Sequence, residues 1–170
     1  MSHNPYSHLI DIFAGGLLTA VGSVVAGIYL KNRDIAEERR KLLRGKLEEL
    51  HLQLYELDKW VQEVSRIAMS FGVGRIGSEK SKSVEDSPIV QINMLVRFYF
   101  RSLRSDSDLL KNEVESFRKG LFSFYAEILE GKQPLKNERY SQLIGVPAEN
   151  IEKKRLQLLE HIENEIQKYI

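Results

Sequence analysis

Arg97, Arg101 and Arg104 stand close together in the second half of the chain, with Tyr99 and Phe100 beside them. Their spacing of four and then three residues would align the three guanidinium groups on one face of a helix. Such a row suits a carboxylate, a phosphate or a single-stranded nucleic acid whose bases stack on aromatic rings. The alternative is a solvated face on which the arginines pair with acidic residues of neighbouring helices. If the protein binds a nucleotide or nucleic-acid signal, these arginines are the first candidates.

The segment 72–77 reads GVGRIG and matches the G-x-G-x-x-G pattern of dinucleotide-binding proteins. That fingerprint needs a preceding strand and a following helix, because its glycines present a helix N-terminus to the pyrophosphate. Here a long helical pattern precedes the glycines and a loop rich in Ser and Lys follows them. We therefore interpret the glycines as the end of a helix and a turn. A phosphate-binding nest remains a candidate, made by backbone N–H groups with Arg75, Lys80 and Lys82.

Residues typical of catalysis are scattered. The histidines form neither an H-E-x-x-H pair nor part of a nucleophile elbow, and the chain contains no cysteine. Glu48 and Glu49 beside His51 are neighbours that a charged helix face produces by chance. The net charge of +1 gives no global reason to expect a polyanionic partner. We expect no enzyme, no metal site and no cofactor.

Ile12–Leu30 is an apolar stretch without a single charge. As a helix it would be about 28 Å long, close to the ~30 Å hydrocarbon core of a bilayer. It therefore predicts a transmembrane helix that follows a short extracytoplasmic tail, residues 1–11. A cleaved secretory signal is one alternative, but residues 1–11 contain no Lys or Arg and no small-x-small cleavage site follows the stretch. A buried core helix is the other alternative.

Basic residues gather on the C-terminal side of this stretch. By the positive-inside rule, the N-terminus should lie outside the inner membrane and residues 31–170 in the cytoplasm. A basic helix next to a membrane also binds anionic lipid headgroups. The candidates for this contact are Lys31, Arg33, Arg39 and Arg40.

One side of the apolar stretch carries small residues, which let membrane helices approach closely. They are Gly15, Thr19, Gly22, Ser23, Ala26 and Gly27. This face predicts a homo-oligomer, and its hydroxyl groups are the mildly polar lining that a narrow ion pathway needs.

A seam of apolar residues continues through a helix predicted at 31–71, at alternating spacings of four and three. This coiled-coil-like pattern allows two arrangements. The seam packs either between chains or against other helices of its own chain. Its members are Leu43, Leu47, Leu50, Leu54, Leu57, Val61, Val64, Ala68 and Phe71.

A loop at 72–87 and three further helices complete the prediction. Ser87 and Pro88 are typical of a helix start, so we favour a buried helix at 88–105, although its alternating apolar residues also fit a strand. The other helices are expected at 107–130, ending near Gly131, and at 147–170. The predicted fold is all-α: one N-terminal transmembrane helix continuing into a cytoplasmic antiparallel helical bundle with one long coiled-coil-like helix.

This layout of a single span followed by a small helical domain resembles the small single-pass membrane effectors of bacterial anti-phage and abortive-infection systems. The resemblance covers the overall layout only and carries over no residues. It implies an antiviral defence protein that senses a cytoplasmic signal and opens a pore or disrupts the membrane. Two other hypotheses remain: a membrane-anchored adaptor that recruits a cytosolic protein or nucleic acid, and a structural subunit of a larger membrane complex. In each case the partners include membrane lipids.

Overall fold

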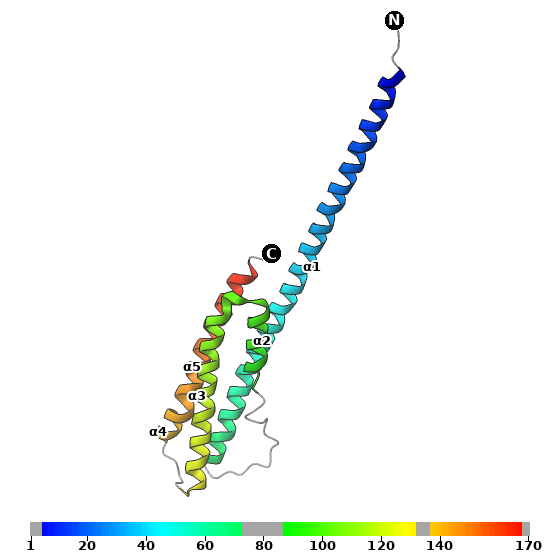
Figure 1. The fold of residues 1–170 in the computed structure, drawn as a ribbon. Helices are drawn as coiled ribbons and strands as arrows, with labels where there is room; N and C mark the ends of the chain where they lie inside the picture. The colour runs from blue at the N-terminus through cyan, green and yellow to red at the C-terminus, as the bar shows by residue number, and fades with distance from the viewer. Residues whose placement is uncertain (1–4, 73–86, 132–136, 168–170) are drawn as a thin grey trace. The chain divides into compact units, whose positions relative to one another are not determined.

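A computed structural model describes residues 5–72, 87–131 and 137–167, without the side chains at 5–22, 24–25, 72 and 137. All secondary structure in these ranges is helical, so the all-α prediction is confirmed for the described part of the chain. The elements are α1 (Pro5–Gly72), α2 (Ile89–Tyr99), a 3₁₀ helix (Arg101–Leu103), α3 (Arg104–Leu129), the short α4 (Asn137–Tyr140), a π-helical turn (Ser141–Gly145) and α5 (Val146–Ile166) (Figure 1).

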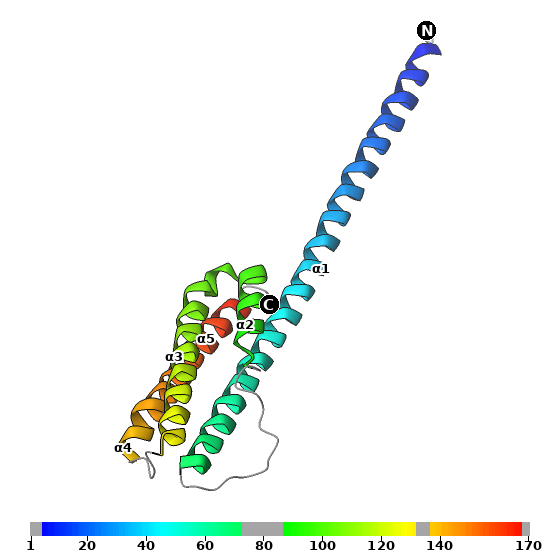
Figure 2. The ribbon, with the colours of Figure 1, turned by 60° about the horizontal axis from the view of Figure 1, so that its bottom comes forward.

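Contacts within the chain separate it into two compact units, Met1–Leu42 and Leu43–Ile170. The first unit contains one described helix, the N-terminal part of α1. We call the second unit the bundle. It contains the rest of α1 together with α2, α3, α4 and α5. Its successive long helices run in opposite directions, so α1 and α3 point one way while α2 and α5 point the other (Figures 1 and 2).

The seam of α1 forms one wall of the core of the bundle. Every seam residue from Leu47 to Ala68 is buried, and Leu43 is partly buried against the same cluster. The seam therefore packs against helices of its own chain, which answers the question that the spacing left open. Trp60, which the spacing did not single out, is also buried, and its ring meets the edge of Phe117 at 5.7 Å between centroids.

Helix α2 begins where Ser87 and Pro88 indicated. The Ser87 hydroxyl oxygen accepts a hydrogen bond from the Ile89 N–H at 3.4 Å, and Pro88 supplies the carbonyl for the Ile92 N–H. The alternation of apolar residues is thus part of a helix and not of a strand. The helix is shorter than expected, because it ends at Tyr99 and the backbone of Phe100 leaves the helical region.

Helices α3 and α5 pack closely on each other and on the π-helical turn. Helix α3 begins at Arg104, before the predicted start at 107, and ends at Leu129, two residues before Gly131, whose φ of 77° favours glycine. Ser107, in the first turn of α3, is buried, and its hydroxyl donates to the Asn93 side-chain oxygen at 2.6 Å. Helix α5 starts at Val146, with Pro147 in its first turn.

Among the residues that the structure describes, no helix offers a segment long and apolar enough to cross a membrane. Within the predicted span Ile12–Leu30, side chains are described at Ser23 and from Ala26 onward. The prediction for the rest of the span therefore lies outside the described side chains.

Candidate functional site

Helix α2 leaves a row of apolar side chains uncovered. Val90, Met94 and Phe98 follow one another at a spacing of four residues and are 60%, 53% and 74% exposed. The opposite side of the helix carries the buried residues Ile89, Ile92, Leu95 and Val96. We call Val90, Met94 and Phe98 the α2 ridge. A row of three large apolar side chains in water is unfavourable unless something covers it.

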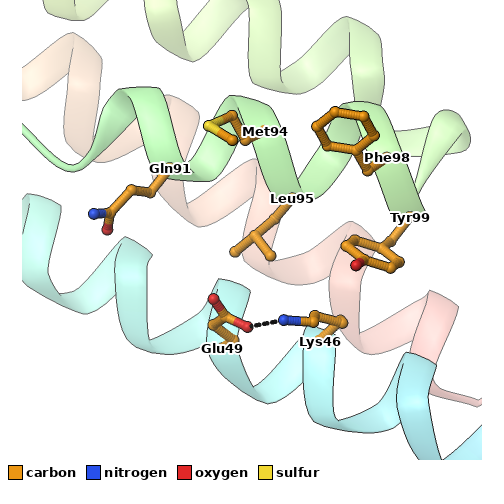
Figure 3. Close-up of a pocket in the computed structure, with 7 residues that line it drawn as sticks. All are labelled: Lys46, Glu49, Gln91, Met94, Leu95, Phe98 and Tyr99. Carbon is orange, nitrogen blue, oxygen red and sulfur yellow. Dashed lines mark hydrogen bonds and ion pairs between the residues drawn. The ribbon is translucent and has the colours of Figure 1, made fainter.

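A groove lies between the α2 ridge and α1. It has a volume of about 360 Å³ and is lined by Lys46, Glu49, Gln91, Met94, Leu95, Phe98 and Tyr99. In Figure 3, Leu95 and Tyr99 point across the groove toward α1, whereas Met94 and Phe98 lie along α2, farther from α1. We call this the α1–α2 groove. The same face therefore has a projecting aromatic ring and, next to it, an apolar hollow.

The α1 side of the groove is closed by an ion pair. Lys46 Nζ lies 2.7 Å from Glu49 Oε2, and the same ammonium group lies 5.6 Å from the centroid of the Tyr99 ring. The hydrogen bond to Glu49 raises the pKa of Lys46 above its ordinary value. The groove thus has an apolar floor and a border on which one positive and one negative charge neutralise each other.

Two polar residues of α2 contact α3. Asn93 accepts the hydrogen bond from Ser107, and Arg97 Nη2 lies 3.7 Å from Asp108 Oδ1. These contacts fix the rotation of α2 about its axis, because they hold one polar edge of the helix against α3 while Leu95 and Tyr99 face α1. The ridge is consequently held facing outward.

The three arginines do not lie on one helix. Arg97 belongs to α2, Arg101 to the 3₁₀ helix and Arg104 to the start of α3, because α2 ends before the second arginine. All three are exposed, and Arg97 pairs with Asp108. Within the described ranges, Arg101 and Arg104 make no ion pair. Their predicted role in binding an anion or nucleic acid stays a prediction, but the helical alignment on which it depended is wrong.

The small-residue face lies in the first part of α1. The backbone is helical throughout, but the side chain of Thr19 and the positions Gly15 and Gly22 lie outside the described side chains. Ser23, Ala26 and Gly27 are exposed, and a Cβ added at Gly27 would meet nothing within 4 Å. The predicted lipid-contact residues are exposed as well. They are Lys31, Arg33, Arg39 and Arg40.

The predicted phosphate nest with Arg75, Lys80 and Lys82 falls outside the described residues.

Neither of the two histidines of the bundle, His51 and His161, lines the α1–α2 groove. His51 is exposed on α1. The carboxylates near it form ion pairs with other residues, Glu48 with Arg44 and Glu49 with Lys46. His161 Nδ1 lies 2.7 Å from Asp106 Oδ2, which joins the last turns of α5 to the first turn of α3. This hydrogen bond raises the pKa of His161 above its ordinary value. The absence of an enzyme activity stays a prediction.

The α2 ridge was not predicted from the sequence. Apolar residues occur on every side of the segment 89–100, and a helix of this kind is usually buried all round. Only its contacts show that one side of it stays open. The available signal was the pattern of Val90, Met94 and Phe98, three apolar residues left over once the other apolar positions are assigned to the core.

Neither family models, nor curated proteins, nor solved structures yield a match to this chain. Function therefore has to be inferred from the residues of the chain itself.

Proposed function

We propose that this protein is a single-pass inner-membrane protein that self-associates through its membrane helix and acts as a pore-forming or membrane-disrupting effector. Its bundle lies on the cytoplasmic side and receives the activating signal. One observation carries the proposal. The N-terminal unit contains a single described helix, and Ile12–Leu30 within it has no charged residue.

A single helix has no second helix in its own unit against which to bury such a stretch. The backbone N–H and C=O groups of a helix bond to each other. Moving Ile12–Leu30 from water into lipid therefore breaks no backbone hydrogen bond within the helix. Burying the apolar side chains is favourable by about 25 cal/mol per Å². The apolar stretch is followed by exposed basic residues, which include Lys31 and Arg33. Their positive charges fit the headgroup region of the cytoplasmic leaflet.

Self-association is supported by the small residues on one side of the stretch. Gly15, Gly22 and Ala26 recur at spacings of seven and four, so a second helix can approach closely along the same line. Thr19 and Ser23 add hydroxyl groups to this side. Several copies packed around such a face would enclose the mildly polar lining that ion passage requires.

The test is leakage of a trapped dye from liposomes that contain the purified full-length protein. Gly22→Leu places a bulky side chain on the small-residue face and should abolish leakage and oligomers in mild detergent. Val21→Leu is the matched control, since its helical position lies away from that face and the substitution should leave both unchanged. A protein that stays monomeric and leaves liposomes tight would overturn the proposal.

A membrane-anchored adaptor is the second candidate, favoured by Arg101 and Arg104. Both are exposed, with no ion pair to another described residue, and can therefore bind an acidic partner without first breaking an internal contact. Charge reversal of both residues should abolish recovery of a cytosolic partner while membrane insertion persists. Reversal of Lys111 and Lys119, which are exposed on α3, is the control with the same change of charge. Equal recovery with both variants would exclude this surface.

A further inference from the structure

We draw no further inference here: the strongest candidate, the α2 ridge with the α1–α2 groove beside it, is an exposed apolar face of the bundle, and nothing in the described part of the chain shows what covers it.

Discussion

Gly120 of α3 lies directly against the carbonyl oxygen of Leu143 in the π-helical turn. A Cβ atom added at Gly120 would overlap that oxygen and also crowd the carbonyl carbon at 3.0 Å. Both groups belong to backbone and neither can rotate away, so α3 and the turn can pack at this distance only because position 120 has no side chain. Ile144, the next residue of the same turn, is fully buried in the core.

Gly120→Ala should therefore destabilise the protein, although alanine is the better helix former. We expect a loss of about 1–3 kcal/mol in the free energy of unfolding, the usual cost of overpacking a core. Gly45→Ala is the control, since a Cβ at Gly45 in α1 meets nothing within 4 Å. It should stabilise the protein by up to about 1 kcal/mol. Urea titrations followed by circular dichroism measure both, and a stabilising Gly120→Ala would contradict the packing described.

The end of α3 depends on Gly131, the residue with a φ of 77°. Its N–H donates to the Ile128 carbonyl at 3.0 Å and closes the helix. Gly131→Ala should cost about 1 kcal/mol, because an L side chain is strained in the left-handed region. Gly131→Asn should cost less, since asparagine tolerates that region better. Equal unfolding free energies for the two variants, measured by urea titration, would show that the conformation does not limit stability.

Tyr140 joins α4 to α1 over a long distance in sequence. Its hydroxyl donates to the Ser65 carbonyl at 3.0 Å, and its ring packs on Phe124 at 5.7 Å between centroids. Tyr140→Phe keeps the ring and removes the hydrogen bond, so the unfolding free energy should fall by about 0.5–1.5 kcal/mol. Tyr55→Phe, at an exposed position of α1, should change it by less than about 0.5 kcal/mol. A loss of similar size in both variants would exclude a specific role for the bond to Ser65.

The pair of His161 and Asp106 predicts a dependence of stability on pH. The hydrogen bond to Asp106 and the negative charge of that carboxylate raise the pKa of His161 in the folded protein above 6.5. The stabilisation is therefore fully present below the unfolded pKa of about 6.5 and is lost as the pH rises through the higher folded pKa. The Tm should fall over this window.

His161→Gln should flatten that part of the Tm profile, and added salt should weaken it because the pair is exposed. His51→Gln is the control, since it removes an exposed histidine of α1 and leaves the contact with Asp106 intact. A profile that His161→Gln leaves unchanged would assign the pH dependence to other groups.

The core of the bundle could be predicted largely from the sequence. The seam from Leu47 to Ala68 and the apolar row of α3 follow from helical spacing alone. Spacing is sufficient there because each helix has one apolar side, and that side has only the other helices to pack against. Gly131 was likewise expected to end a helix, and its backbone conformation is the reason. The buried members of the α3 row are Leu110, Val114, Phe117, Leu121 and Phe124.

The exposed apolar side of α2 could not be predicted in the same way. In α2, apolar residues occupy every side of the helix, so spacing does not distinguish the side that packs inward from the side that stays open. That choice depends on contacts with other helices. Asn93 bonds to Ser107 and Arg97 pairs with Asp108, which turns Phe98 outward.

By itself, the sequence determined that α1, α3 and α5 are helical and which of their sides are apolar, because these depend on local spacing. It also determined the charge-free character of Ile12–Leu30. The tertiary structure alone decided that the seam of α1 is covered by its own chain, that the three arginines belong to separate elements, and that the α2 ridge is left uncovered. The physical reason is that spacing shows which side of a helix is apolar. Only packing between distant segments decides which apolar residues are buried and which stay exposed.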